Sequence, residues 1–262
     1  MNIDGKIVPA NYGRITSLAL DPVEKKPLRR FCPGKYVLSV GSFGCDLHCP
    51  FCQNHSISWS DEAMALEETA DTVTPQRIAD IAEFYRDRGN IGAAFTYNEP
   101  LVGYEFVRDT AKAVRERGMK NIIVTNGSAK LWVLEETAQY TDAMNIDLKG
   151  FTERFYRDVL KGDLDTVKRF IARAVQLCHV EITTLIIPGE NDSDGEMEEI
   201  SRWIAGLTDA DGNVIGDRIP LHISRFFPRF NMTDRDATDV RHIYHLAGIA
   251  GKHLRYVYTG NC

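Results

Sequence analysis

Short, continuous hydrophobic runs alternate along this chain with longer segments whose apolar residues recur at helical spacing. Residues 35–43, KYVLSVGSF, form such a run and predict a buried strand, because β-branched residues favour strands. Two helical patterns follow, at 74–89 and 99–118, and each leads into a further short run, at 92–97 and 121–127. The remaining chain predicts helices over 131–141, 164–177, 194–207 and 233–251, and strands over 142–150, 180–189, 218–226 and 254–261.

The alternation predicts an α/β protein with a parallel sheet, since the runs are hydrophobic throughout and helices connect them. About seven strands suffice for a closed or partly open β/α barrel or for a doubly wound sheet. Polar residues follow nearly every strand, and the strand ends of a β/α barrel face one pocket, so we favour the barrel. We expect one domain over 35–262, preceded by an irregular lead-in over 1–34.

Composition and charge exclude several classes of protein. The chain is 44% hydrophobic and 26% charged with a formal net charge of -6, which is ordinary for a globular protein and argues against general nucleic-acid binding. The first residues lack the features of a signal peptide, and no apolar run reaches the length of a membrane span. We therefore expect a cytoplasmic protein without a membrane partner.

Three of the six cysteines fall within CDLHCPFC, residues 45–52, in the spacing CxxxCxxC. Structural zinc sites take four ligands, and His48 or His55 could complete such a set, although the sequence holds no second cysteine pair. Iron-sulfur clusters are held by cysteine thiolates, so three cysteines leave one iron of a cubane open to a substrate or cofactor. Cys178 reads as a buried core thiol, and Cys32 is the one other cysteine placed to be a ligand.

CDLHCPFC resembles the CxxxCxφC motif of the radical S-adenosylmethionine (SAM) enzymes, in which φ is aromatic and corresponds to Phe51. With TYNEP, VTNG, NIDLKG, IIPGEND and HISRFFPRF in the same order, the chain resembles the branch of pyruvate formate-lyase activating enzymes. Within that branch it is most similar to the radical SAM enzyme of the AmmeMemoRadiSam system. The resemblance implies a partial (β/α)6 TIM-like barrel with a [4Fe-4S] cluster on Cys45, Cys49 and Cys52. It also implies that SAM binds the fourth iron and is cleaved by one electron to a 5′-deoxyadenosyl radical.

The resemblance further implies a set of SAM contacts. Tyr97, Asn98 and Glu99 stand where the family's GGE element meets the methionine amino group, although both glycines are replaced. Asp147 and Lys149 match residues that hold the ribose and the carboxylate, and His222 matches a histidine near the ribose. Thr125 and Asn126 are expected to line the pocket. The family's cation site is in doubt, because Val124 stands where an aspartate is common.

Together these features predict a radical SAM enzyme that removes a hydrogen atom from a substrate, with no catalytic side chain assigned. The substrate class with the best support is a backbone glycine of a glycyl-radical enzyme partner. A small molecule, a peptide or an RNA is the alternative, and a non-catalytic iron-sulfur or zinc protein is the rival from another class. A low-potential electron donor, flavodoxin or ferredoxin, is expected as a partner.

Overall fold

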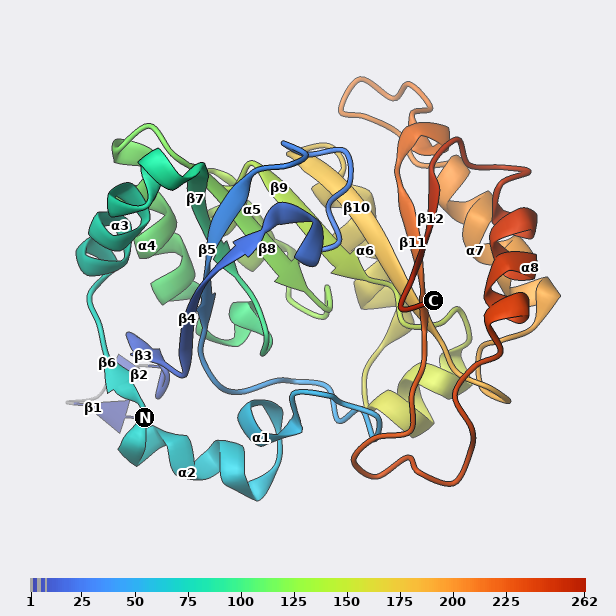
Figure 1. The fold of residues 1–262 in the computed structure, drawn as a ribbon, viewed down its shortest axis with the longest axis horizontal. Helices are drawn as coiled ribbons and strands as arrows, with labels where there is room; N and C mark the ends of the chain where they lie inside the picture. Colours follow the sequence, from blue (N-terminus) through green and yellow to red (C-terminus); the bar gives the residue numbers. More distant parts are fainter. Residues whose placement is uncertain (1, 4–5, 8) are drawn as a thin grey trace. The chain divides into compact units, whose positions relative to one another are not determined.

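A computed structural model describes residues 2–3, 6–7 and 9–262 of the chain (Figure 1). Its strands are β1 Asn2–Ile3, β2 Lys6–Ile7, β3 Arg14–Ile15, β4 Ser17–Pro22, β5 Tyr36–Gly41, β6 Asp71–Thr72, β7 Asn90–Phe95, β8 Lys120–Thr125, β9 Ala143–Asp147, β10 His179–Ile186, β11 Leu221–Arg225 and β12 Val257–Gly260. Its α-helices are α1 His55–Ser58, α2 Asp61–Thr69, α3 Pro75–Phe84, α4 Tyr104–Glu116, α5 Leu131–Ala138, α6 Leu164–Ala174, α7 Asp194–Ala205 and α8 Val240–Ala250. The short 3-10 helices are η1 Val23–Lys25, η2 Arg86–Arg88, η3 Pro100–Gly103 and η5 Gly216–Arg218, and η4 Phe155–Leu160 is a π-helix.

The main sheet has the hydrogen-bonded strand order β12-β11-β10-β9-β8-β7-β5-β4. The pairs β5–β7, β7–β8, β10–β11 and β11–β12 are parallel, whereas β4 runs antiparallel to β5. The predicted α/β class with a parallel sheet is therefore confirmed. Within the described residues the sheet is open rather than closed, since β4 and β12 are its two ends in that order.

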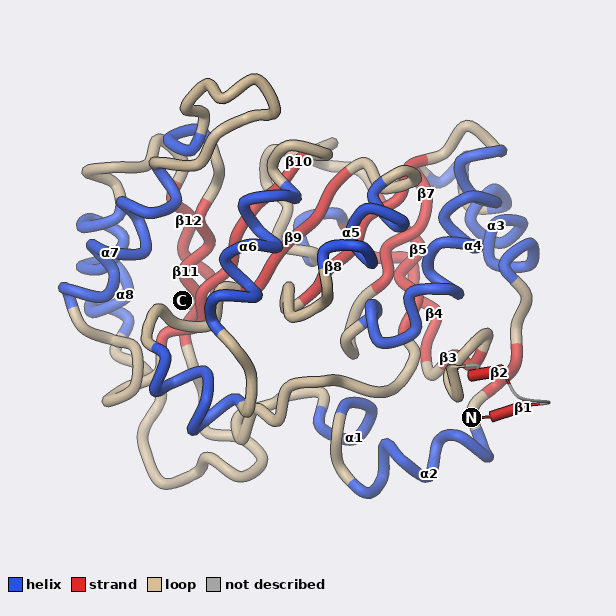
Figure 2. The backbone as a smooth tube through the Cα atoms, turned by 180° about the vertical axis from the view of Figure 1, so that it is seen from behind, coloured by secondary structure: helices blue, strands red, loops and turns tan. Residues whose placement is uncertain are grey.

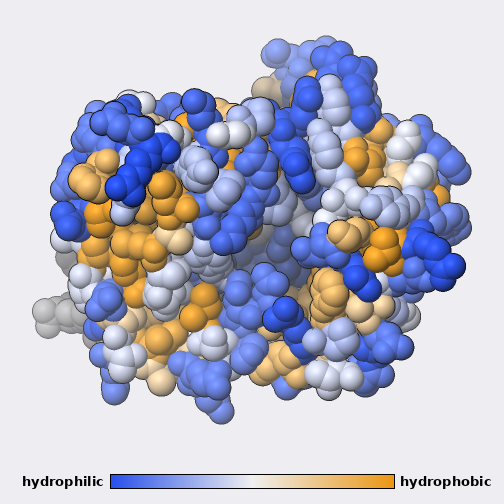
Figure 3. Space-filling view, viewed as in Figure 1, coloured by the Kyte–Doolittle hydropathy of each residue, from blue (hydrophilic) through white to orange (hydrophobic). Residues whose placement is uncertain are grey.

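The chain separates into two compact units, which are described in turn. Unit 1 comprises residues 1–46, 54–125 and 129–144. In it, α3 and α4 pack side by side, as Figure 2 also shows. Helix α3 begins where its sequence signals a start, because the Thr74 side chain accepts a hydrogen bond from the backbone N–H of Arg77 and a proline follows. On the face drawn in Figure 3, hydrophobic side chains gather over part of unit 1, toward the left of the view.

Unit 2 comprises residues 47–53, 126–128 and 145–262. It holds the ladder β10-β11-β12, whose register pairs Thr183 with His222 and His222 with Tyr258. Helices α7 and α8 pack against one another in this unit. Helix α6 has an N-cap at Asp163, whose side chain accepts a hydrogen bond from the backbone N–H of Thr166. None of the helices in the described part of the chain is both long and apolar enough to cross a membrane.

Three local predictions need correction. The lead-in over 1–34 is not irregular throughout, because residues 17–22 form β4 and pair with β5, while residues 1, 4–5 and 8 lie outside the described part of the chain. The segment between 55 and 69 carries α1 and α2, which the hydrophobic pattern does not predict. The last helix begins at Val240 rather than near 233, since the Asp239 side chain caps it there. The expected single domain over 35–262 stays a prediction.

Candidate functional site

The three cysteines of the motif lie in residues 45–52, called the cysteine segment below. In unit 1, the loop that follows β7 holds the residues on either side of this segment. The backbone N–H of Ser42 donates to Asn98 Oδ1 at 3.1 Å, and Asn98 Nδ2 donates to the carbonyl of Gly44 at 3.1 Å. The N–H of Glu99 donates to the same carbonyl. On the far side of the cysteines, Asn54 Nδ2 donates to the carbonyl of Tyr97 at 2.8 Å. The loop 97–99 thus holds the chain both before Cys45 and after Cys52.

Tyr97 has a left-handed backbone, with φ of +79°. For a bulky residue this conformation costs about 1–3 kcal/mol, so the surroundings must stabilise it. Its phenol oxygen donates to Asp21 Oδ2 at 2.5 Å, and the ammonium of Lys26 lies 4.5 Å from the centre of its ring. A glycine at this position would adopt the same backbone without strain.

Glu99 is buried, and its carboxylate accepts hydrogen bonds inside unit 1. Oε1 accepts from the N–H of Leu101 at 3.0 Å, which caps η3, and from the hydroxyl of Thr125 at 2.7 Å. The carboxylate therefore serves as a helix-terminal cap, while its part in binding SAM stays a prediction. Thr125, at the end of β8, is buried as well.

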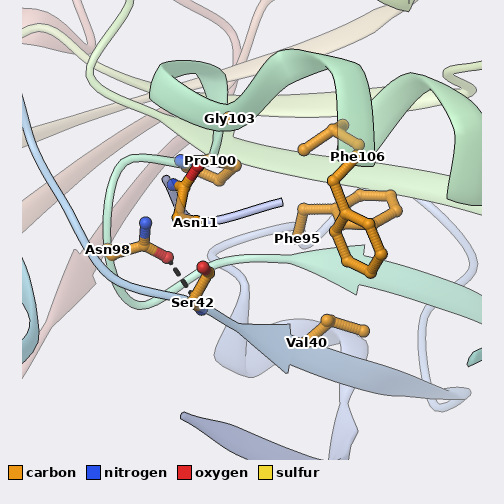
Figure 4. Close-up of a pocket in the computed structure, with 9 residues that line it drawn as sticks. Asn11, Val40, Ser42, Phe95, Asn98, Pro100, Gly103 and Phe106 are labelled. Carbon is orange, nitrogen blue, oxygen red and sulfur yellow. Dashed lines mark hydrogen bonds between the residues drawn. The ribbon is translucent and has the colours of Figure 1, made fainter. Parts of the chain in front are cut away.

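A small cavity of about 20 Å³ lies beside this loop (Figure 4). Val40 and Phe95 on neighbouring strands line it together with Asn98 and Phe106. Such a volume accommodates about one water molecule, so this cavity excludes a nucleotide. It belongs to the packing behind the loop.

Residues 47–53, which include the second and third cysteines of the motif, belong to unit 2 and are held there by η4. The N–H of His48 donates to the carbonyl of Leu160 at 2.8 Å, and the ring of Phe51 stacks on Phe155 with centroids 6.5 Å apart and planes 6° from parallel. The N–H of Asn231 donates to the carbonyl of Pro50 at 2.8 Å. π-Helical turns are rare in proteins, and many of those that occur lie at functional sites. Here the π-helix supports the segment between the first and the last predicted ligand.

The cysteines of the segment suit iron-sulfur ligation. All six cysteines of the chain lie within the described residues and none is in a disulfide. Cys49 is buried, and burial raises the pKa of its thiol to about 11, while the charge of Lys149 acts in the opposite direction. A buried thiol favours the neutral form in the absence of a metal, and coordination to iron replaces that proton. Cys178, predicted as a core thiol, is half-buried, and its thiol donates to the carbonyl of Ala174.

Asp147 and Lys149, at the end of β9, form an ion pair with Nζ 2.8 Å from Oδ2. Residues two apart on an extended chain point to the same side, which lets the two side chains meet. The backbone N–H of Lys149 donates to the hydroxyl of Tyr156, which is fully buried in η4. Both side chains are partly exposed, so the pair presents one negative and one positive group at the end of its strand.

His222 is buried on β11 and makes a contact that the sequence does not predict. Its Nε2 lies 2.7 Å from Oε2 of Glu181, a fully buried carboxylate on β10, and the other carboxylate oxygen lies 3.0 Å from Nε2 of His179. The His222 ring packs against Tyr258 on β12, with centroids 5.3 Å apart. A carboxylate between two histidines is a polar network on one face of the strands of unit 2.

The structure brings some of the predicted residues together and separates others by unit. Contacts of 2.7 to 3.1 Å join Asn98 and Glu99 to the flanks of the cysteine segment and to Thr125. Asn126 is buried in unit 2, where its Oδ1 accepts from the N–H of Ser128. Sequence reasoning missed Glu181 and Asp21, and their one signal is that a carboxylate inside or beside an apolar strand needs a buried partner.

Comparisons with known proteins show the family of the chain. A family model described as the radical SAM superfamily matches residues 39–204. An uncharacterised protein of Methanocaldococcus jannaschii is 37% identical over 263 residues, covering 99% of this chain and 74% of that protein. The pyruvate formate-lyase 1-activating enzyme of Escherichia coli is 24% identical over 177 residues, covering 65% of this chain and 68% of that enzyme. The crystal structure of Streptococcus suis SuiB bound to S-adenosylmethionine shares the fold, with a TM-score of 0.63 and 15% identity over 84% of this chain and 49% of SuiB.

The chain belongs to the radical SAM superfamily. It is a radical SAM enzyme, and its cofactors are a [4Fe-4S] cluster and S-adenosylmethionine. Enzymes of this family commonly take electrons from partners such as flavodoxin or ferredoxin. The predicted class of protein is therefore confirmed.

Proposed function

We propose that Cys45, Cys49 and Cys52 hold the [4Fe-4S] cluster and that SAM occupies the iron that they leave open. The observation that carries this proposal is the support of the cysteine segment: its two flanks are hydrogen-bonded to the loop 97–99, and its middle rests on η4. Three thiols within eight residues of the chain suit a cluster that needs one open coordination position. When bound, the cluster supplies the electron that cleaves SAM to methionine and a 5′-deoxyadenosyl radical.

Different residues of the chain bind different groups of SAM. Lys149 offers an ammonium to the carboxylate of the methionine moiety, and Asp147 accepts hydrogen bonds from ribose hydroxyls. The side-chain amide of Asn98 already makes three hydrogen bonds inside the protein, so Asn98 contacts SAM through its backbone. Glu99, with Thr125, supplies negative charge near the amino group, which is the other charged end of an amino acid.

His222 contacts the ribose in this proposal, and Glu181 orients its ring. A ring nitrogen that is hydrogen-bonded to a carboxylate fixes which nitrogen faces the ligand. Asn126 lines the same pocket. Phe51, which lies between two of the proposed ligand cysteines in the sequence, is buried against Phe155 and helps to keep water from the cluster.

The proposed substrate is a backbone glycine of a partner protein, and the reaction is the removal of a hydrogen atom from its α-carbon. The similarity to the pyruvate formate-lyase 1-activating enzyme supports this choice. The alternative is a small molecule, a peptide or an RNA, which the same radical chemistry accommodates. A reduced flavodoxin or ferredoxin is the proposed electron donor.

The experiment measures the transfer of deuterium from a labelled substrate into 5′-deoxyadenosine. The cluster-loaded protein is reduced with SAM in the presence of candidate partners that carry deuterated glycine, and 5′-deoxyadenosine is analysed by mass spectrometry. Deuterium in 5′-deoxyadenosine identifies the glycyl substrate, and deuterium transfer from a labelled small molecule or RNA identifies the alternative. Absence of 5′-deoxyadenosine from a reduced, cluster-loaded protein contradicts the proposed function.

A further inference from the structure

Tyr97 combines a strained backbone with an anchored side chain, and the two features lie at opposite ends of one residue. Its φ of +79° is rare for an aromatic residue, and strained residues concentrate at functional sites when the surrounding structure holds them. The left-handed conformation is therefore adopted here by a residue type that disfavours it. Something in the fold must therefore fix it.

The side chain of Tyr97 ends in a buried charge cluster. Asp21 receives hydrogen bonds from the Tyr97 hydroxyl at 2.5 Å, from Ser39 at 2.7 Å and from Lys26 at 2.9 Å. Lys26 is 1% exposed, so its ammonium has exchanged water for Asp21 and for the face of the Tyr97 ring. A Cβ on Gly41 would lie 2.9 Å from the ring, so the strand beside Tyr97 also leaves room for it. The ring therefore has one position.

The backbone of Tyr97 and its neighbour reaches the flanks of the cysteine segment. The left-handed turn directs the Tyr97 carbonyl to Asn54, two residues after Cys52. The following residue, Asn98, bonds Ser42 and Gly44, just before Cys45. A change of φ at Tyr97 would break these contacts together, because all of them depend on the direction of one peptide segment.

We propose that Tyr97 is a positioning residue, which the buried Asp21–Lys26 pair locks in a left-handed conformation so that the loop 97–99 aligns the cysteine segment with the amino group of SAM. The inference rests on the proposed function for its ligand. Its structural part, the control of the two flanks by one backbone angle, concerns the chain alone.

The test compares Tyr97→Ala with Tyr97→Gly, because the two variants lose the same anchor and differ in backbone freedom. Glycine adopts positive φ readily, whereas alanine does not. A role in packing alone ranks glycine below alanine, since glycine removes one more carbon and gains more chain entropy on unfolding. Tyr244→Phe on α8, whose tyrosine is exposed, is the control for the loss of a hydroxyl, and Tyr97→Phe isolates the bond to Asp21.

Two measurements are made on each variant. Hydrogen exchange of the peptides covering 40–46 and 97–101 is measured on the metal-free protein, and the dissociation constant for SAM is measured on the cluster-loaded protein. We expect Tyr97→Ala to weaken the binding of SAM about ten-fold and to raise the rate of hydrogen exchange in both peptides. Tyr97→Gly should weaken the binding of SAM about three-fold. Tyr97→Phe falls between the wild type and Tyr97→Ala, and Tyr244→Phe matches the wild type.

The order of the variants decides the matter. An alanine variant that behaves as well as or better than the glycine variant in hydrogen exchange overturns the proposal, and so does wild-type behaviour in both. If the wild-type protein binds no SAM, the proposed function fails on its own, and the exchange order in the metal-free protein still tests the control of the flanks by Tyr97.

Discussion

The carboxylate of Glu181 lies 2.7 Å from Nε2 of His222, although 41 residues separate them in the chain. Glu181 is fully buried on β10, and its second oxygen contacts His179. A buried carboxylate is stable only with such partners, so the histidines and the carboxylate depend on one another. This network fixes the orientation of the His222 ring.

Replacing Glu181 with glutamine tests that dependence. Glu181→Gln keeps the shape but replaces a carboxylate that accepts on both oxygens with an amide that accepts on one. We expect SAM affinity to fall about ten-fold, as for the loss of one charge-assisted hydrogen bond, while iron content stays at the wild-type level. Equilibrium binding of SAM by the cluster-loaded protein is the measurement.

Glu198→Gln is the matched control for this variant, because Glu198 on α7 also contacts a histidine, His253, at 2.8 Å, but in a half-buried pair. It should leave SAM binding unchanged. Equal binding by the two variants, at either level, contradicts the assignment of Glu181 as a positioning residue.

Loss of either member of the Lys149–Asp147 ion pair should weaken the binding of SAM, and loss of Lys149 should weaken it more. Lys149→Met removes the ammonium proposed to bind the SAM carboxylate and should weaken SAM by about 2 kcal/mol, close to thirty-fold. Asp147→Asn should weaken SAM less, since a ribose hydroxyl can also bond to an amide. The dissociation constants are measured on cluster-loaded protein.

Lys252→Met, which alters an exposed lysine of unit 2, is the control and should bind SAM as the wild type does. A Lys149→Met variant with unchanged affinity shows that the ion pair serves the fold alone.

Asp21 predicts how stability depends on pH. Burial by itself raises the pKa of Asp21, but hydrogen bonds from Lys25 and Tyr97, and then from Lys26 and Ser39, lower it well below its usual value. A carboxyl group whose pKa is lower in the folded state contributes stability that is present above about pH 4 and is lost as the pH falls below that value.

Asp21→Asn should therefore lower the free energy of unfolding at pH 7 by about 3 kcal/mol, since it leaves Lys26 buried without its counter-charge. That corresponds to a melting temperature about 6–12 °C lower. The difference between variant and wild type should shrink at pH 3, and Asp234→Asn, at an exposed ion pair, should change little. A difference that grows toward low pH contradicts the sign of this argument.

Most of the fold could be predicted because its strands are buried on both faces. Residues 36–41 form β5 as one apolar run, and α3 begins at its Thr-Pro signal, so local sequence and tertiary packing agree there. The helix over 61–69 was missed because Ala63 alone among its residues is buried, which leaves almost no periodic apolar face to detect. Strand β4 was missed because it is an edge strand that ends in proline and is only partly buried.

The site could be predicted only where one short motif carries the chemistry. The spacing of the three cysteines within one segment is enough to select them, whereas Asp147 and Lys149 are selected by the resemblance to the activating enzymes. The Asp21–Tyr97 bond joins residues 76 apart. Nothing in the sequence near either residue indicates such a pairing, because it depends on the register of β4 against β5 and on the turn after β7.

The measurement that tests the central claim most directly is anaerobic reconstitution of Cys49→Ala beside Cys178→Ala, with iron and acid-labile sulfide determined per chain. Both cysteines belong to unit 2, and each has its own local environment, so the second variant controls for loss of a thiol. We predict about four irons and four sulfides per chain in the wild type and in Cys178→Ala, and loss of most of both in Cys49→Ala. Equal cluster content in the two variants, or a wild-type chain without labile sulfide, would contradict the account.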